Sequence, residues 1–280
     1  MDLELAANQI RIDIITMLER AGSGHPGGAL GMADIFASLY FSILNHDPSN
    51  PDWEERDRLI LSNGHIVPVR YAAMAESGYF DVKELKTLRK LNSRLQGHPE
   101  RGKLPGLETT SGPLGSGLGQ AAGIALGAKL DNKRFRVYCV MSDGEQDEGN
   151  TWEAVLFAVK YKLGNLTAII DRNKIQLSGN TEEIMPINFL VDKYKSFHWN
   201  VEEIDGSNFK EIATAIKKAK DIYDRPTVII ANTIPGKGVS FMENKYVWHG
   251  KAPNKEEAKL ALKELEKTRD EIKERIKEND

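Results

Sequence analysis

One segment of the chain predicts a strand, a helix and a second strand in direct succession. The apolar run 135–141 is rich in β-branched and aromatic residues, as in a buried strand, and it stops just before Asp143. Apolar residues within 151–163 recur at the spacing of one helix face, and the apolar run 166–170 follows and ends just before Asn173. Because a right-handed crossover makes such strands parallel, we expect Asp143 and Asn173 side by side at the carboxyl ends of neighbouring strands. Open α/β sheets bind their ligands at that edge.

The rest of the chain continues this alternation of strands and helices. Further helices are predicted at 1–20, 33–44, 68–78, 82–91, 120–129 and 210–220, and further strands at 58–61, 201–204 and 227–232. Few hairpin turns separate them, so the sequence predicts an α/β fold with a doubly wound parallel sheet and helices on both faces. We expect residues 1–254 to form this domain and residues 255–280 to form a charged C-terminal helix packed by a thin apolar stripe.

Composition excludes several classes of function. Lys and Arg number 38 against 41 Asp and Glu, a net charge of −3, so no excess of positive charge indicates a nucleic acid or membrane partner. The single cysteine, Cys139, lies inside a predicted strand and can form neither an intrachain disulfide nor a cysteine metal cluster. No apolar stretch is long enough for a membrane span, and residues 1–20 are unlike a signal peptide. We therefore expect a cytoplasmic protein.

Four of the six histidines lie in loops rich in glycine or proline. They are His25 in SGHPG, His65 in SNGHI, His98 in QGHPE and His249 in VWHGK. Each alone could be a loop or capping residue, but four together favour loops that approach a ligand closely, with imidazole as a hydrogen-bonding group or proton carrier. They lack the short spacings of a zinc site, so a polyhydroxylated or phosphorylated substrate suits them better.

The oxygen atoms of Asp143 and Asn173 favour a hard divalent cation, Mg²⁺ or Ca²⁺, which commonly carries phosphate. The alternative is that Asp143 begins a turn and Asn173 caps a strand, with no ligand. Two other phosphate motifs fail. The Lys in the PGKG segment 235–238 lacks the context of a Walker loop, and the glycine pattern at 115–119 is not directly preceded by a strand, as a dinucleotide fold requires.

Longer segments around these residues resemble one known family. The stretch from SDGEQDEG to DRNKI resembles the thiamine diphosphate motif, and the loops around it resemble transketolase. The similar segments are, in chain order, GSGHPGGALGMAD, NHDPSNPDWEERDRLILSNGH, GHPE, TTSGPLGSGLGQAAGIALG, LGNLTAIIDRNKIQLSG and PGKGVSFMEN. They cover nearly the whole chain. The resemblance therefore implies that residues 1–254 are the diphosphate-binding amino-terminal domain of a transketolase, a parallel α/β domain.

The resemblance also implies roles for individual residues. Mg²⁺ or Ca²⁺ would be held by Asp143, Asn173 and the backbone carbonyl of Ile175, and Gly144 would meet the diphosphate. Further contacts to the cofactor are implied for His65, Asn173, His249 and the backbone of Gly112, Pro113 and Leu114.

Three histidines are expected to be catalytic and to face substrate. His25 and His249 would handle the hydroxyl proton, and His98 would orient the terminal hydroxyl of the donor. The implied reaction is the reversible transfer of a two-carbon ketol unit from a ketose phosphate to an aldose phosphate, with the chemistry carried by thiamine diphosphate. One departure from the family motif is Ser142, where the family usually has glycine.

The resemblance also implies a protein partner. In this family, the glutamate that activates the cofactor and the basic residues that bind the sugar phosphate belong to a following domain, which we do not find in this sequence. We therefore expect the chain to be the amino-terminal subunit of a split transketolase. A second polypeptide would carry the pyrimidine-binding and carboxyl-terminal domains, and Glu148 would support the interface by analogy.

Two alternative functions stay open at this point. One is another thiamine diphosphate enzyme, either deoxyxylulose-phosphate synthase or the first component of a 2-oxo-acid dehydrogenase, because a shared fold does not determine the reaction. The other is a non-catalytic protein that binds thiamine diphosphate or a sugar phosphate. The loops around His25, His65 and His98 resemble transketolase and favour that family.

Overall fold

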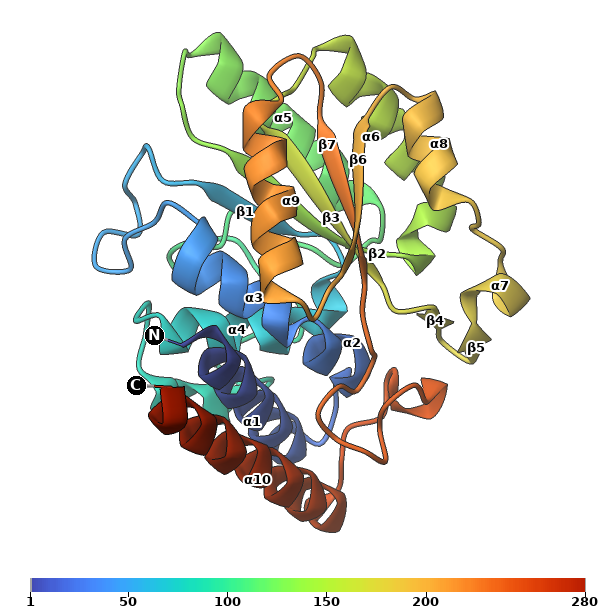
Figure 1. Ribbon diagram of the computed structural model, residues 1–280. Helices are drawn as coiled ribbons and strands as arrows, with labels where there is room; N and C mark the ends of the chain where they lie inside the picture. The colour runs from blue at the N-terminus through green and yellow to red at the C-terminus, as the bar shows by residue number, and fades with distance from the viewer. Residues whose placement is uncertain (1, 280) are drawn as a thin grey trace.

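A five-stranded parallel sheet forms the centre of the molecule in the computed structural model, which describes residues 2–279 (Figure 1). The strand order is β1-β2-β3-β7-β6. The strands are β1 (Arg58–Leu61), β2 (Val137–Ser142), β3 (Leu166–Arg172), β6 (Asn200–Asp205) and β7 (Thr227–Asn232). All four pairings are parallel, and Ser142 pairs with Asp171, so the residues that follow β2 and β3 lie at one edge of the sheet. The predicted α/β class is confirmed.

Both faces of the sheet are covered because side chains along each strand alternate between two apolar clusters. In β2, Tyr138 and Val140 belong to one cluster, whereas Cys139 and Met141 belong to the other. Helices α1 (Leu3–Ala21), α3 (Ala33–Ser38), α4 (Val67–Glu76), α9 (Phe209–Asp221) and α10 (Lys255–Asn279) contribute to the first cluster. Helices α5 (Ser116–Leu130), α6 (Gly149–Lys160) and α8 (Leu190–Ser196) contribute to the second. Central strands are therefore buried on both sides.

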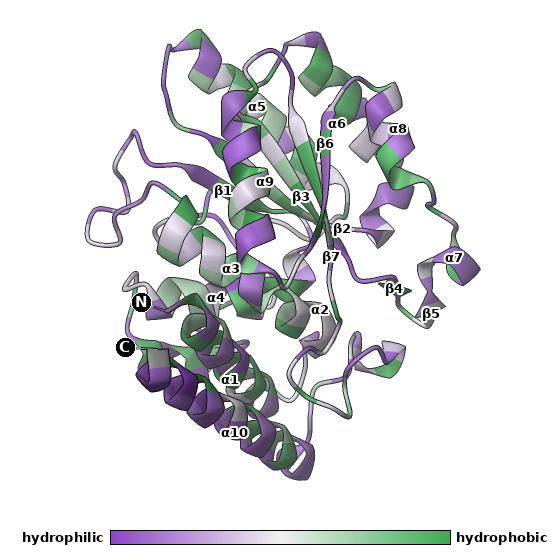
Figure 2. Ribbon diagram, viewed as in Figure 1, coloured by the Kyte–Doolittle hydropathy of each residue, from purple (hydrophilic) through white to green (hydrophobic). Residues whose placement is uncertain are grey.

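The C-terminal helix α10 packs along α1, and the end of α10 lies close to the start of α1 (Figure 1). Ala258, Leu265 and Ile272 of its apolar stripe are buried, while the rest of the helix is mostly charged. Figure 2 shows the contrast, with the central strands mainly green and α10 mainly purple. Residues 1 and 280, the outer limits of the two predicted segments, lie outside the described part of the chain. No described helix combines the length and apolar character needed to cross a membrane.

The structure differs from the predicted elements in several places. A short helix, α2 (Pro26–Gly31), forms within the glycine-rich loop, and the predicted helix 82–91 is a 3₁₀ helix at Val82–Thr87. The predicted helix 33–44 ends in a π turn after α3. A small projection after β3 was not expected: the two-residue strands β4 (Ile175–Gln176) and β5 (Gly179–Asn180) lead into α7 (Thr181–Ile184). Elements this short carry too few residues to show a period in the sequence.

Candidate active site

A cavity of about 470 Å³ lies at the carboxyl edge of the sheet. It is lined by residues from loops far apart in the sequence, which the parallel topology brings to one edge. From the predicted set, the lining includes His25, His65, His98, Gly112, Leu114, Asp143, Gly144, Asn173, Ile175 and His249. Pro113 is exposed and does not line the cavity. Gly28, Ser142, Asp147, Glu148, Gln176 and Leu177 complete the lining.

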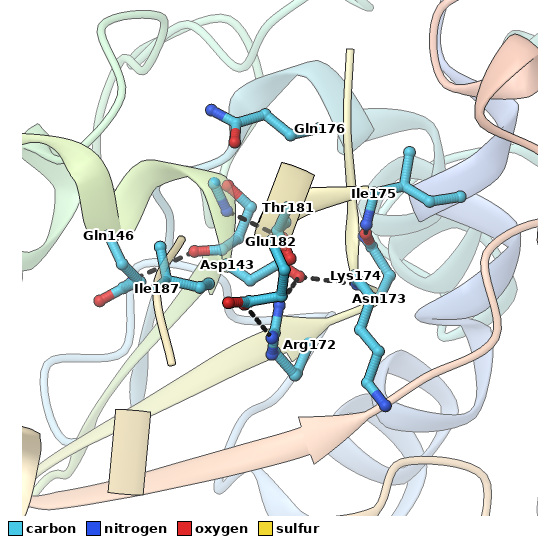
Figure 3. A network of polar contacts seen from close by, with 12 residues as sticks. Asp143, Gln146, Arg172, Asn173, Lys174, Ile175, Gln176, Thr181, Glu182 and Ile187 are labelled. Atoms are coloured by element: carbon cyan, nitrogen blue, oxygen red, sulfur yellow. Dashed lines mark hydrogen bonds and ion pairs between the residues drawn. The ribbon is translucent and has the colours of Figure 1, made fainter. Parts of the chain in front are cut away.

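Asp143 follows β2 and its side chain is almost completely buried. Its Oδ2 accepts hydrogen bonds from the backbone N–H of Lys174 at 2.7 Å and from Arg172 at 3.1 Å, while Oδ1 accepts from the N–H of Gly144 at 2.8 Å (Figure 3). Burial raises the pKa of Asp143 to about 6, although these donors and the charge of Arg172 act in the opposite direction. The carboxylate is thus held in one orientation at the end of its strand.

Asn173 is oriented by Asp171, a residue to which sequence reasoning gave no role. Asn173 Nδ2 donates to Asp171 Oδ2 at 2.8 Å, and the N–H of Ile175 donates to Asn173 Oδ1 at 2.9 Å. Thr233 donates to the other oxygen of Asp171. Burial raises the pKa of Asp171 to about 7, and the charge of Asp143 adds to that rise. The signal was available in the sequence, because residues two apart at the end of a strand share a face.

The residues at this edge fit a hard cation with a phosphate. The donor set is a carboxylate, a side-chain amide and backbone groups, which suits Mg²⁺ or Ca²⁺ rather than a softer metal. A Cβ on Gly28 would lie 2.9 Å from Ile66 and 3.5 Å from Asp171 Oδ2, whereas one on Gly112 would meet nothing within 4 Å. A side chain at position 28 would therefore collide with Ile66, whereas the space beside Gly112 is open. Among the described residues, no group of three or more His, Cys, Asp and Glu is arranged as a metal site.

Three histidines form a cluster at this cavity. The ring centroids of His25 and His65 are 4.9 Å apart, and the ring of His249 lies 5.5 Å from each. Burial lowers the pKa of His25 to about 4 and that of His65 to about 3, and each ring is further disfavoured as a cation by its neighbours. Burial also lowers the pKa of His249 and of His98, the latter with help from Arg89. At neutral pH the cluster therefore consists of neutral imidazoles that can donate or accept a proton.

A third buried carboxylate, Glu145, joins three of the loops and was not anticipated. Its Oε1 accepts from the N–H of Gly115 at 2.9 Å and from the hydroxyl of Ser62, and its Oε2 accepts from the N–H of Ser142 at 2.9 Å. The hydroxyl of Ser142 lies 3.4 Å from the same oxygen and accepts from the N–H of Glu145. The serine that replaces the usual glycine is therefore part of this network. Glu148, three residues on, is exposed at the rim of the cavity.

Comparison with known proteins gives consistent matches along the chain. The family model described as "Transketolase, thiamine diphosphate binding domain" matches residues 3–274. A 6-deoxy-6-sulfo-D-fructose transketolase subunit from a Clostridium species is 42% identical over 267 residues, with 95% of this chain and 97% of that protein covered. A subunit of the apulose-4-phosphate transketolase from Actinobacillus succinogenes is 39% identical, with 94% and 96% covered.

Longer proteins match over only part of their length. The transketolase of Rattus norvegicus is 40% identical over 271 residues, which is 94% of this chain and 42% of that protein. The crystal structure of transketolase from Campylobacter jejuni superposes with a TM-score of 0.89 at 34% identity, covering 95% of this chain and 43% of that one. The chain thus spans less than half the length of these transketolases, but nearly the full length of the Clostridium and Actinobacillus proteins.

Proposed function

This chain belongs to the transketolase family, to the part that binds thiamine diphosphate, and on that premise we propose that it is the cofactor-binding subunit of a two-subunit transketolase. The proposed reaction is the transfer of a two-carbon ketol unit from a ketose phosphate to an aldose phosphate. The observation that carries the proposal is the placement of His25, His65, His98 and His249 in one cavity with Asp143 and Asn173. Proton-transfer groups and a cation-binding edge are both needed for this chemistry.

The diphosphate end of the cofactor would bind at the edge of the sheet. Asp143, Asn173 and the carbonyl of Ile175 would hold Mg²⁺ or Ca²⁺, and the backbone of Gly144 would meet the phosphate. Asp171 supports this role, because its hydrogen bond fixes the amide of Asn173. When bound, thiamine diphosphate supplies the reactive carbon that cleaves a ketose and carries two carbons to an aldose.

Around that carbon, the chain supplies proton transfer and orientation. Neutral His25 and His249 can each take a hydroxyl proton and return it, which a permanently charged side chain could not do. His98 lines the same cavity and would orient the terminal hydroxyl of the donor, while His65 would contact the cofactor. The backbone from Gly112 to Leu114 would lie along the aminopyrimidine ring.

The protein partner would be a second polypeptide with the pyrimidine-binding and carboxyl-terminal domains. The relatives matched over nearly their full length are named as subunits, which supports this arrangement. Glu148 would contact that partner from the rim of the cavity. Those relatives are named for reactions with a sulfonated fructose and with apulose 4-phosphate. We therefore propose that the substrates are anionic sugars. We also propose that the enzyme acts in cytoplasmic carbohydrate metabolism, in the pentose phosphate pathway.

The test is to isolate the chain from native extract and assay it with whatever copurifies. We expect a second polypeptide, and ketol transfer from a ketose phosphate to an aldose phosphate that depends on thiamine diphosphate and Mg²⁺. Activity with pyruvate alone would instead favour the other thiamine diphosphate enzymes. Cofactor binding without any transfer would favour a binding protein, and full activity of the isolated chain would refute the two-subunit arrangement.

A further inference from the structure

Arg172, the last residue of β3, connects the predicted metal ligand to the projection that follows it. Its side chain is 8% exposed. One guanidinium nitrogen donates to Asp143 Oδ2 at 3.1 Å and to Thr181 Oγ1 at 2.7 Å. The other donates to Glu182 Oε1 at 2.9 Å and to Asn188 Oδ1 at 3.3 Å (Figure 3). A single buried cation therefore contacts both Asp143, which lines the cavity, and the projection.

The geometry of these contacts requires arginine. A guanidinium is planar and presents its N–H groups in a fixed fork, so contacts to several acceptors determine the direction of each one. Asp143 is almost fully buried beside it, and no other side chain donates to that carboxylate among the described residues. Lysine could provide a charge near Asp143, but its single nitrogen could not reach all four acceptors.

The projection, residues 177–189, is anchored by Arg172 and by Ile187, which is buried in the second apolar cluster. It carries large apolar side chains that are exposed, with Leu177 at 70% and Phe189 at 75%. Leu177 also lines the cavity. The projection is also anchored by the N–H of Thr181, which donates to Lys174 O at 3.0 Å, and by the pairing of β4 with β5. Three of the four acceptors of Arg172 lie on this segment.

We propose that Arg172 is a positioning residue that orients the Asp143 carboxylate toward a divalent cation and holds residues 177–189 against the same site. The proposal rests on the proposed function, because it takes Asp143 as a metal ligand. Arg172 itself does not line the cavity. Its two tasks are separable, because the contact to Asp143 and the contacts to Thr181, Glu182 and Asn188 involve different acceptors.

The experiment compares Arg172→Gln, Arg172→Lys and Glu182→Gln with the wild-type chain, each as the full-length protein alone and with its copurified partner. Arg225→Gln is the control, because Arg225 is half-exposed and, within the described part of the chain, pairs only with its neighbour Asp224 at 3.0 Å. Three quantities are measured: the apparent Kd for Mg²⁺ at saturating thiamine diphosphate, kcat of the complex at saturating Mg²⁺, and amide hydrogen exchange across residues 177–189 without ligands.

For Arg172→Gln we expect about a 10- to 100-fold weaker Mg²⁺ affinity, the usual effect of removing a group that orients a ligand. Saturating Mg²⁺ should restore most of the lost kcat, and exchange across residues 177–189 should accelerate. Arg172→Lys should restore much of the Mg²⁺ affinity but not the protection from exchange. Glu182→Gln should accelerate exchange with little effect on Mg²⁺, and Arg225→Gln should change neither.

Each remaining outcome has a definite meaning. Equal Mg²⁺ affinity in Arg172→Gln and wild type would overturn the orienting role, and equal exchange would overturn the anchoring role. If circular dichroism shows that Arg172→Gln loses its structure globally, Arg172→Lys becomes the deciding variant. The proposal then requires faster amide exchange across the projection in Arg172→Lys than in wild type. A wild-type complex that binds neither Mg²⁺ nor thiamine diphosphate would overturn the proposed function as well, so the two failures are distinguishable.

Discussion

The imidazole rings of His25 and His65 lie 4.9 Å apart, centroid to centroid, in the wall of the candidate active site. Both are largely buried, and the ring of His249 is 5.5 Å from each. Charging one ring would place a cation in a poorly solvated position next to two groups that can also become cations. This explains why the pKa of His25 falls to about 4 and that of His65 to about 3.

Acid should therefore destabilise the protein through this cluster. Because the folded-state pKa of His65 lies below its ordinary value of 6.5, its contribution to stability is present above pH 6.5 and is lost as the pH falls toward 3. We expect His65 to account for on the order of 2 kcal/mol of lost unfolding free energy between pH 7 and pH 5. Urea unfolding of wild type and His65→Asn at both pH values measures this difference.

The matched control is His198→Asn, because His198 is exposed and lies outside the cavity. The unfolding free energy of His198→Asn should fall as much as that of wild type between pH 7 and pH 5, whereas that of His65→Asn should fall less. Parallel pH dependence in wild type and His65→Asn would show that His65 is not a buried neutral imidazole.

Asp143→Ala should abolish the metal-dependent binding of thiamine diphosphate and leave the fold intact. The substitution removes a charged oxygen ligand at a strand end and also leaves Arg172 without its buried partner. We expect a loss of at least about 100-fold in affinity by calorimetry, with a lowered Tm and a native circular dichroism spectrum. Asp221→Ala, at the exposed end of α9, is the control. Binding equal to wild type would remove Asp143 from the metal site.

Much of this site was predictable because its signals are local. The apolar runs that precede Asp143 and Asn173 predict two neighbouring parallel strands, and the structure pairs Ser142 with Asp171 at their ends. The four histidines in glycine-rich loops were likewise expected to meet a ligand, and all four line one cavity. Their individual catalytic roles stay predictions.

The parts that were missed depend on contacts between distant residues. Glu145 meets Ser62, which is 83 positions away, and no periodic pattern links them. The helix α2 has three glycines in six residues, so its propensity is poor, but every residue in it is buried and packing stabilises it. Arg172 reads in the sequence as an ordinary residue between Asp171 and Asn173. Its role depends on hydrogen-bond acceptors that come together only when the projection is folded.

Asp13 should make the protein less stable at alkaline pH. It is buried on α1 beside Glu76, and burial together with the charge of Glu76 raises its pKa to about 8. A carboxyl with a raised folded-state pKa contributes stability that is complete below pH 3.8 and is lost as the pH rises through 8. Asp13→Asn stays neutral and can still accept from Gln9, so its stability relative to wild type should be on the order of 4 kcal/mol more favourable at pH 8 than at pH 5.

Chemical denaturation at the two pH values tests this expectation. Asp270→Asn, an exposed position on α10, is the control and should show no pH-dependent advantage. An Asp13→Asn protein whose stability follows wild type at both pH values would show that Asp13 is already ionised at little cost, and the predicted coupling to Glu76 would then be wrong.

Two glycines on α5 should respond in opposite directions to the same substitution. A Cβ on Gly117 would lie 2.4 Å from Ser62 Cβ and 2.7 Å from Ser62 Cα, so the backbone at the end of β1 would have to move. A Cβ on Gly123 would meet nothing within 4 Å. We therefore expect Gly117→Ala to lower the unfolding free energy by about 1–3 kcal/mol through overpacking. Gly123→Ala should raise it by about 0.5–1 kcal/mol because alanine is the better helix former.

The same two variants separate packing from cofactor binding. Gly117 donates its N–H to Ser62 Oγ at 3.1 Å, and Ser62 in turn contacts Glu145, which holds the loop that follows Gly112. Displacing Ser62 should therefore weaken thiamine diphosphate binding as well as stability, whereas Gly123→Ala should leave binding by the isolated chain unchanged. Urea denaturation and calorimetric titration on both variants measure the two effects. A Gly117→Ala protein as stable as Gly123→Ala would contradict the close approach of α5 to β1.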